Sequence, residues 1–594
     1  MERTLIKDTI NEKGGQVLIK GRVFVRRDHG KIIFLDVADY SGTIQVVCVS
    51  CEAGVGDAVE ITGLVKTRPE KLVNPKLETG EIELEAEEVK ILAKSETYPF
   101  DLTKPDLEVE LPTLLDFRGL TLRHPKIMAI FKVQMVVIDA FRRALLAKDF
   151  IEFFSPGIIP AVPEGGTEVF EIRYFNHKAF LSQSPQLYKS LLVSSFERVF
   201  SVNQIYRAEP SVTTRHITEA TSLDAEFGFI RDWEEVRDMA EYVIKYILAE
   251  VGKKCQKELE MFGAIIPKVA PKIPCVRLRE AQQIIFERTG RDHRQEKDPD
   301  PEDEREICKW AAETYGSDLV FISHYPTKTR PFYTYPDEKE PEFNQGFDLI
   351  GCGVEWMTGG RRIHEYKTLL VHAKEWGIDP ETIELYLQGF KYGMPPLGGF
   401  AFGAERITMH ILGLKNVREA SMFPRDMERI DTRLSLVKSG GVFEKIKKLL
   451  DENGIKYQVM EHAAAKTSEE SALIRGTQLK QGAKALVVFG DGKPLMIVLP
   501  ANLKVDFNMV KKSLKIDDVR IATPEEVRKL TQTEIGAVPP FGNLFGLPLY
   551  VDKKMGGNEE IAFNAGEHTK SIKMKYADFE KVTNPTIGNY SSEG

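Results

Sequence analysis

The pattern of apolar residues changes twice along this chain, and each change marks a boundary between units that fold around separate cores. Up to about residue 100, short apolar runs alternate with turns, as in VLIKGRVFVRR, KIIFLDVAD and GTIQVVCVS. From about 113 to 437, longer helical patterns alternate with strands, and a polar break at 438–441 precedes a third region. One core cannot support 594 residues, so we predict a multidomain protein.

Composition narrows the class of protein without identifying it. Charges interrupt every long apolar stretch, so we expect no membrane span, and six cysteines without a disulfide pattern indicate a reducing, cytoplasmic compartment. We interpret the Cys48-x-x-Cys51 pair as strand residues rather than as a metal site. The net charge of −8 provides no bulk attraction to nucleic acid, so phosphate contacts must come from local basic clusters.

Each region predicts a different fold, and together they predict an α+β multidomain class. Residues 1–100 have the strand spacing of a five-stranded OB-fold barrel, and a proline-punctuated connector follows at 101–116. Residues 117–437 form the α+β domain, in which the charged stretch 288–306 is interpreted as a solvated surface insertion. Residues 441–590 form a mixed α/β domain with a hairpin that turns at Gly490–Gly492.

Two segments of the middle region carry groups suited to phosphate chemistry. Arg207 and Glu209 share a strand face, and a guanidinium can bind a phosphate while a carboxylate binds an amine or a metal. A surface hairpin with salt bridges is the alternative interpretation. Further on, LGGFAFGAERITMHIL places Arg406 on the first turn of a helix after a glycine-rich strand. Glu355 and Thr358 offer a carboxylate and a hydroxyl that suit Mg²⁺.

These segments resemble the three signature motifs of class II aminoacyl-tRNA synthetases. FIEFFSPGIIPAVPEGGTEVF resembles motif 1, YRAE with TTRH resembles motif 2, and GGFAFGAERI resembles motif 3. The resemblance covers nearly all of residues 1–437. It implies an antiparallel-sheet catalytic domain that uses ATP and Mg²⁺, and a homodimer formed through motif 1. A noncatalytic paralogue would be expected to lose Arg207 or Arg406, and a small amide-forming ligase would lack the barrel.

The resemblance also implies roles for the motif residues. Arg207, Glu209 and Arg406 form the catalytic set, in which Arg207 stabilises charge on the α-phosphate and Arg406 lies over the adenine and reaches the γ-phosphate. Glu355 and Thr358 hold the metal ion. The implied ATP-binding set is Arg207, Glu209, Arg215, His216, Glu355 and Arg406.

The segments LSQSPQLYKS and GGRRIH resemble the aspartyl branch of this family. They imply that Lys189 and Arg362 bind the side-chain carboxylate of L-aspartate. Asparagine would leave a buried cation poorly paired, at a cost of roughly 2–5 kcal/mol. An asparaginyl enzyme is the alternative. The implied aspartate-binding set is Glu164, Ser184, Gln186, Lys189, Asp224, Thr358 and Arg362.

The barrel is expected to bind the anticodon of tRNA(Asp). Phe34 and Gln45 match anticodon-contacting positions of the family, and Arg26 and Arg27 can reach phosphates. A base stacked on an exposed aromatic is worth about 1–3 kcal/mol, although a core position is the alternative for Phe34. The tRNA(Asn) anticodon differs in one base, so tRNA(Asn) stays open as a second substrate. Subgroup signals are mixed, since YPTKTRPFY is archaeal-type and VNPKLETGEIEL bacterial.

Residues from about 441 resemble the YbaK/prolyl-tRNA editing-domain family, which deacylates mischarged tRNA. The segments concerned are EHAAAKTSEESALIRG, GAKALVV, GAVPPFG and FNAGEHTKSIKM. The resemblance implies that the loop from Gly536 to Gly542 surrounds the aminoacyl ester, that Lys484 binds the ester or the terminal phosphate, and that His568 lines the pocket. A domain that only binds tRNA is the alternative.

Overall fold

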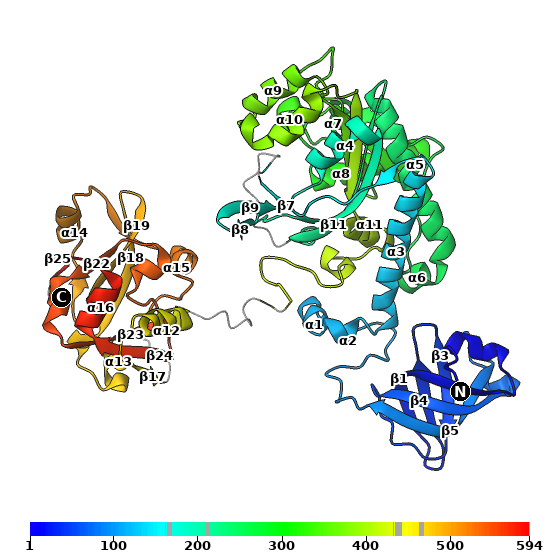
Figure 1. Cartoon of the computed structure of the whole chain (residues 1–594), viewed down its shortest axis with the longest axis horizontal. Coiled ribbons are helices and arrows are strands. Elements are labelled where there is room, and N and C mark those ends of the chain that lie inside the picture. The colour runs from blue at the N-terminus through cyan, green and yellow to red at the C-terminus, as the bar shows by residue number, and fades with distance from the viewer. Residues whose placement is uncertain are drawn as a thin grey trace. The chain divides into compact units, whose positions relative to one another are not determined.

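The chain forms two compact units, Met1–Arg433 and Leu434–Gly594. The computed structural model describes residues 1–75, 77–160, 162, 169–209, 213–431, 433, 442–462 and 468–592. The first unit contains the barrel and the large α+β domain, and the second contains the C-terminal domain (Figure 1). No helix within the described ranges is long and apolar enough to cross a membrane.

The N-terminal strands close into a five-stranded barrel in the order β1-β2-β3-β5-β4. Buried and partly exposed residues alternate along β2, β3 and β4, so one face of each strand fills the barrel interior. The predicted barrel is therefore confirmed. Its strands are β1 (Gln16–Asp28), β2 (Ile33–Ala38), β3 (Thr43–Cys48), β4 (Ala58–Thr67) and β5 (Ile82–Ala93).

An eight-stranded sheet forms the centre of the large domain, in the order β12-β13-β14-β15-β16-β11-β10-β6. Its inner strands pair antiparallel, and only the edge strands β6 and β12 run parallel to their neighbours. The strands are β6 (Ile151–Glu152), β10 (Arg198–Tyr206), β11 (Glu219–Gly228), β12 (Cys275–Arg277), β13 (Leu319–Ser323), β14 (Gly346–Gly351), β15 (Val354–Arg362) and β16 (Leu397–Gly403). A separate small sheet contains β7 (Ile158–Ile159), β8 (Glu171–Tyr174) and β9 (His177–Leu181).

Helices surround the large sheet (Figure 1). They are α1 (Leu111–Asp116), α2 (Arg118–Thr121), α3 (Pro125–Leu146), α4 (Gln186–Phe196), α5 (Trp233–Lys254), α6 (Gln256–Phe262), α7 (Leu278–Thr289), α8 (Pro301–Tyr315), α9 (Tyr366–Glu375), α10 (Glu384–Lys391) and α11 (Ala404–Leu412).

The alternation along β11 determines which side chains reach the functional face of the sheet. Leu223, Ala225 and Phe227 point into the main core, which also contains the buried residues of α3 and α5. Because strand side chains alternate, Asp224 and Glu226 point to the opposite face, against which α4 packs. One strand thus supports the core on one side and supplies two carboxylates to the other.

The charged stretch at 288–306 differs from its predicted role as a solvated insertion. Its second half forms the start of α8, where Asp300 caps the helix in a reciprocal arrangement with Asp303. Asp303 is 1% exposed, and the side chain of Glu304 is 12% exposed. Helical periodicity turns these carboxylates towards the domain, so the surface interpretation is wrong for them.

The C-terminal unit combines two main sheets, in the orders β21-β18-β19-β22-β25 and β17-β24-β23. The predicted hairpin is present, because Asp491 and Gly492 both adopt positive φ between β18 and β19, as a tight two-residue turn requires. The strands are β17 (Tyr457–Glu461), β18 (Ala483–Gly490), β19 (Lys493–Pro500), β20 (Lys504–Val505), β21 (Val519–Ile521), β22 (Leu549–Asp552), β23 (Glu560–Glu567), β24 (Lys570–Lys575), β25 (Thr586–Gly588) and β26 (Ser591–Ser592). The helices are α12 (Val442–Glu452), α13 (Ser468–Arg475), α14 (Phe507–Leu514), α15 (Pro524–Thr531) and α16 (Tyr576–Thr583).

Candidate active site

A cavity of about 220 Å³ opens on the α4 side of the large sheet. Side chains from α4, β11 and β15 line it together with Arg207, which follows β10. The cavity therefore contains both predicted aspartate-binding residues and the arginine predicted to contact the α-phosphate of ATP. The predicted aspartate-binding residues that line it are Ser184, Gln186, Lys189, Asp224, Thr358 and Arg362. The remaining member of that set, Glu164, lies outside the described residues.

Buried ion pairs connect the two predicted aspartate-binding cations. Lys189 Nζ lies 2.9 Å from Asp224 Oδ1 and 3.4 Å from Glu226 Oε2, and Arg362 Nε lies 3.1 Å from Glu226 Oε1. Burial alone would raise the pKa of Glu226, but the neighbouring Arg362 and Lys189 hold it below its ordinary value. Both cations are thus charge-compensated and held in place before any substrate binds.

Glu226 is a site residue that the sequence prediction missed. It is fully buried, and it also accepts hydrogen bonds from Gln186 Nε2 at 3.4 Å and from the Ser190 hydroxyl at 3.3 Å. The available signal was its position two residues after Asp224, which places both carboxylates on one strand face.

The predicted nucleotide contacts form two groups. Glu209 lies between Arg207 and His216, with an Oε1–Nη1 distance of 3.7 Å and an Oε2–Nε2 distance of 3.3 Å. Arg406 Nη1 lies 3.6 Å from Glu355 Oε1, and Arg215 Nη1 lies 3.6 Å from Glu304 Oε2 (side chains from α11, β15 and α8). Each arginine is therefore paired with a carboxylate. One of these carboxylates, Glu304, belongs to the stretch that the sequence prediction had placed on the solvated surface.

Carboxylates near this group have properties suited to a divalent cation. Burial raises the pKa of Glu304 to about 7, and the nearby Glu355 adds to the shift while Arg215 opposes it. Burial and the neighbouring Asp348 likewise raise the pKa of Glu355. Within the described chain, Glu304 Oε2 and Asp348 Oδ1 are buried without a hydrogen-bond partner. A hard cation would satisfy such oxygens, so the chemistry of these side chains suits Mg²⁺, although in the described part of the chain Glu304, Asp348 and Glu355 do not converge in one cluster.

A bulge explains how Glu355 and Thr358 can act together although they are three residues apart. On a regular strand such residues point to opposite faces. Here Leu349 opposes Met357 and Ile350 opposes Glu355, which leaves Trp356 as an extra residue. Trp356 and Met357 both enter the main core, so Glu355 and Thr358 share the other face.

The barrel presents some of its predicted anticodon contacts on a common face. Phe34 opposes Arg27 across β1 and β2, and its ring is partly exposed rather than part of the core. Gln45 accepts a hydrogen bond from Arg27 at 3.3 Å and therefore joins them. Arg26 instead opposes the buried Leu35 and donates to the Cys51 carbonyl, so Arg27 is the arginine that accompanies the aromatic ring. Strand alternation separates these neighbouring arginines, and the expected contact of Arg26 with phosphate stays a prediction.

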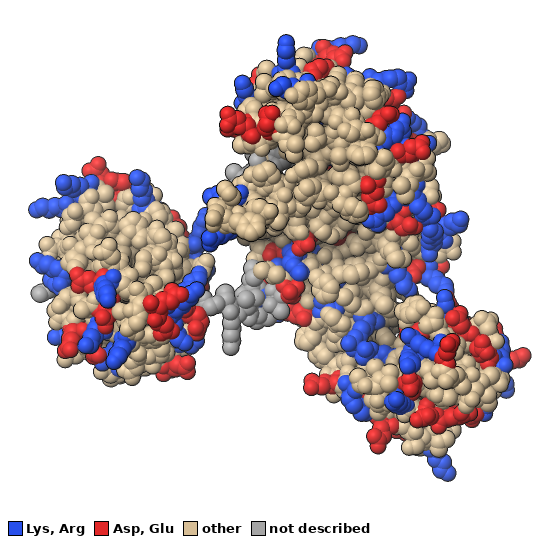
Figure 2. All heavy atoms as spheres, viewed as in Figure 1, with Lys and Arg blue, Asp and Glu red and all other residues tan. Residues whose placement is uncertain are grey.

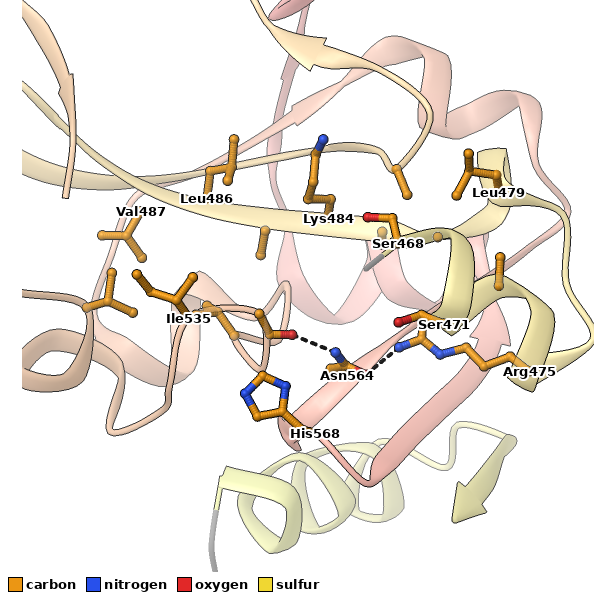
Figure 3. A pocket seen from close by; sticks show the side chains of 18 of the residues that line it. Ser468, Ser471, Arg475, Leu479, Lys484, Leu486, Val487, Ile535, Asn564 and His568 are labelled. Atoms are coloured by element: carbon orange, nitrogen blue, oxygen red, sulfur yellow. Dashed lines mark hydrogen bonds between the residues drawn. The ribbon is translucent and has the colours of Figure 1, made fainter. Parts of the chain in front are cut away.

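A second cavity, of about 340 Å³, lies in the C-terminal unit (Figure 3). Lys484, Gly536 and His568 line it, as the resemblance implies. The predicted role of Gly542 is not supported, because this residue does not line the cavity. It packs so closely that an added Cβ would lie 2.8 Å from the Leu547 carbonyl oxygen, which is a structural constraint.

The one face drawn in Figure 2 shows how charged side chains are distributed there. On the face visible in Figure 2, basic and acidic side chains are interspersed rather than gathered in a single-sign patch. This face therefore offers no single-sign patch for bulk attraction to nucleic acid.

Comparison with protein families identifies all three parts. The family described as tRNA synthetases class II (D, K and N) matches residues 110–427. An OB-fold nucleic acid binding domain matches residues 17–92, and an aminoacyl-tRNA editing domain matches residues 462–582. The chain therefore belongs to the class II tRNA synthetases, with the barrel and the editing domain predicted from the sequence.

Curated relatives narrow this class. An aspartate--tRNA(Asp/Asn) ligase from Deinococcus radiodurans is 41% identical over 437 residues, which are 72% of this chain and 99% of that protein. An aspartate--tRNA(Asp) ligase from Pyrococcus furiosus is 38% identical over 445 residues, 72% of this chain and 100% of that protein. The chain is a member of the aspartate--tRNA ligase family.

A solved structure agrees with this placement at the level of the fold. The asparaginyl-tRNA synthetase from Pyrococcus horikoshii, complexed with asparaginyl-adenylate, is 28% identical with a TM-score of 0.66. The match covers 72% of this chain and 99% of that chain. The fold is therefore common to aspartyl and asparaginyl enzymes, so side chains in the cavity must distinguish the two amino acids.

Proposed function

We propose that the aspartate--tRNA ligase activity of this chain depends on recognition of the aspartate side chain by Lys189 and Arg362. The observation that carries this proposal is their convergence on one cavity with Arg207. The ammonium group of the substrate meets Asp224, and its side-chain carboxylate meets the two cations through charge-assisted hydrogen bonds. Glu226 positions both cations from behind, because it contacts each of them while fully buried.

The reaction follows from this placement in two transfers. The α-carboxylate of aspartate attacks the α-phosphorus of ATP, the bond to the bridging oxygen breaks, and pyrophosphate leaves. Arg207 stabilises the charge that develops on the α-phosphate, while Arg215 and Arg406 face the outer phosphates. The 3′-terminal ribose hydroxyl of tRNA then attacks the adenylate carbonyl and loses its proton, and AMP departs. The protein needs no covalent nucleophile, since it accelerates both steps by positioning the reactants.

Glu355 and Thr358 are the residues we assign to Mg²⁺, with Glu304 and Asp348 close by. A bound Mg²⁺ would supply positive charge to neutralise phosphate oxygens. The raised pKa values of Glu304 and Glu355 support this assignment, because crowded carboxylates are stabilised in their charged form by a bound cation.

ATP–pyrophosphate exchange with aspartate or asparagine tests the amino-acid assignment. The two amino acids differ only in their side chains, which end in a carboxylate in aspartate and in an amide in asparagine. We therefore expect at least about 30-fold faster exchange with aspartate. Exchange driven by asparagine and not by aspartate would overturn the proposed recognition.

The range of tRNA substrates is a further part of the proposal. Aspartate--tRNA(Asp/Asn) ligases and aspartate--tRNA(Asp) ligases match this chain with similar identity, so we propose charging of both tRNAs. Transcripts of each tRNA, assayed side by side, test this proposal.

We also propose a homodimer through motif 1, where Ile151, Phe154 and Ile158 expose apolar surface. Light scattering that gives the monomer mass would contradict the dimer.

We further propose that the editing domain hydrolyses an aminoacyl-tRNA ester in the 340 Å³ cavity. Lys484 supports this role because it lines the cavity and burial lowers its pKa, which reduces the cost of contact with an uncharged ester. A domain that only binds tRNA is the alternative. Full-length protein incubated with a panel of aminoacyl-tRNAs decides between them, since binding alone would not raise ester loss above the rate in buffer.

A further inference from the structure

The cavity of the editing domain has one chemically distinct end. Its apolar end is lined by Leu486, Val487 and Ile535, whereas Arg475 and Asn564 lie at the other end and point towards each other (Figure 3). Among the described residues that line the cavity, several are basic and none is acidic. A neutral aminoacyl side chain would need only the apolar end, so the basic end requires another explanation.

Arg475 is held in place by neutral groups alone. Its Nε donates to the Ser571 hydroxyl at 2.8 Å, and Nη2 donates to the Asn564 side-chain carbonyl. Asn564 in turn donates through Nδ2 to the Gly536 carbonyl at 2.5 Å, so the guanidinium is one side chain away from the loop proposed to hold the ester. This chain of hydrogen bonds fixes the orientation of the guanidinium at the cavity wall.

The charge of Arg475 lacks a compensating carboxylate in the described part of the chain. Neither of its hydrogen-bond partners carries a charge, and burial lowers its pKa to about 10. A partly buried cation without an anionic partner is unfavourable unless a ligand provides one. Lys484 does not share this position, since its Nζ donates to the Leu503 carbonyl at 2.7 Å and Glu469 lies near it.

The geometry points to an acidic aminoacyl group as the ligand of this end: we propose that the editing domain hydrolyses aspartyl-tRNA, with Arg475 binding the side-chain carboxylate. This inference rests on the proposed deacylase function of the same cavity. The synthetase domain of this chain produces aspartyl esters, so aspartyl-tRNA is available as a substrate. A cavity that recognises aspartate would bind this aminoacyl group whichever tRNA carries it, whereas a purely apolar cavity would reject it because of its charge.

The hydrolysis balances without a further reactant. The oxygen of a water molecule attacks the ester carbonyl carbon, and the bond from that carbon to the ribose oxygen breaks. The ribose oxygen takes up one proton, and the products are tRNA with a free 3′-terminal hydroxyl and aspartate, whose new carboxyl group releases its proton at neutral pH. Arg475 takes no part in the proton transfer and acts as a specificity-determining contact.

Two esters of a single tRNA provide the primary test. Asp-tRNA(Asn) has a side-chain carboxylate where Asn-tRNA(Asn) has an amide, and the two esters are otherwise the same. Their nucleotide contacts are therefore identical. Full-length protein is added without ATP, AMP or pyrophosphate, which prevents synthesis or reversal through the adenylate. We expect release of aspartate about 10- to 100-fold faster than release of asparagine, the range expected for a charged hydrogen bond. Equal rates, or faster release of asparagine, overturn the proposal.

Variants then locate the selectivity. Arg475→Met is expected to lower aspartate release to about the rate for asparagine while it leaves asparagine release unchanged. Arg475→Lys, which keeps the charge, should retain part of the preference. Arg520→Met, which removes an exposed arginine paired with Glu526, is the matched control and should behave as the wild type.

The outcomes separate the possible sources of the anion. If Arg475→Met slows both esters equally, the guanidinium binds a tRNA phosphate or orders the Gly536 loop, and the carboxylate proposal is overturned. If wild-type protein releases asparagine or alanine but not aspartate, the deacylase function stands and the acidic specificity fails. If no ester is hydrolysed faster than in buffer, the deacylase function itself fails.

Discussion

Arg362 is the residue at which recognition of aspartate can be separated from binding of ATP. Its guanidinium contacts Glu226 and donates to the Gly399 carbonyl at 3.1 Å, on the amino-acid side of the cavity. We expect Arg362→Leu to slow aspartate-dependent exchange by at least about 100-fold, because removal of one member leaves a buried charge unpaired. The Michaelis constant for ATP should change little.

Arg361 provides the matched control for that variant. It neighbours Arg362 on β15, but its guanidinium stacks over Tyr335 and faces Glu338, away from the cavity. Arg361→Leu should therefore retain exchange within a few-fold. A loss of ATP binding in Arg362→Leu, measured by equilibrium binding, would show that this residue had been assigned to the wrong substrate.

Glu304 should make the stability of the synthetase unit depend on pH. Burial raises its pKa to about 7 in the folded protein, against an ordinary value of 4.5. The folded state therefore binds the proton more tightly, and the stability associated with it is present below about pH 4.5 and lost as the pH rises through 7. Glu304→Gln cannot ionise, so its thermal unfolding temperature relative to wild type should increase between pH 5 and 8.

The expected size of this effect is at most about 3 kcal/mol, and the shifted pKa on which it rests already includes the opposing influence of Arg215. Differential scanning fluorimetry with a metal chelator and without ATP measures it. A wild-type minus variant difference that stays constant over this pH range would show that Glu304 is already ionised in the folded protein.

The sequence predicts which single residues lie together where one strand or one motif determines the position. Lys189, Asp224 and Arg362 reach one cavity because each lies within a short recognisable segment. Glu226 could not be ranked as highly, because its importance depends on α4 packing over β11, which local periodicity does not reveal. Glu304 was missed for the same reason, since only the fold brings α8 beside β15.

At the scale of elements, the close pairing of β11 and β16 requires glycine at position 399. Gly399 opposes Glu226, and a Cβ there would lie 2.1 Å from Glu226 Oε2 and 2.2 Å from the Ala225 carbonyl oxygen. Gly399→Ala must therefore displace the carboxylate that holds both cations. We expect a loss of about 1–3 kcal/mol of stability together with impaired aspartate-dependent exchange.

Gly119→Ala is the control for this substitution, because nothing lies within 4 Å of the added Cβ and the residue is within α2. It should leave the unfolding temperature unchanged or raise it slightly. If Gly399→Ala keeps the stability and the exchange rate of wild type, the strands are able to separate at this point, and the rigid support proposed for Glu226 is wrong.

Elements differ in how well the sequence predicts them. The barrel strands and the hairpin at Asp491 and Gly492 follow from alternation and turn residues, which are local properties. The bulge at Trp356 does not, because an extra residue in one strand is defined only by the partner strand. Without it, Glu355 and Thr358 would be assigned to opposite faces of the sheet.

At the scale of the whole molecule, the two units should separate by function. The first unit ends at Arg433, and relatives that align over 99–100% of their length cover 72% of this chain. A protein cut after residue 437 should therefore retain aspartate-dependent exchange within about twofold of the full chain, since the cavity and the motif arginines lie before the cut. A large loss of exchange would mean that the second unit contributes to the synthetase site.

The same truncation tests whether the two activities oppose each other on one product. In a steady-state charging assay with aspartate, ATP and tRNA(Asn), the full chain both forms and hydrolyses the ester, so its plateau of Asp-tRNA(Asn) should lie below that of the truncated protein. Arg475→Met in the full chain should raise the plateau towards the truncated level, because it removes hydrolysis without removing the domain. Equal plateaus for all three proteins, at matched exchange rates, would show that the C-terminal unit does not act on the aspartyl ester that the first unit makes.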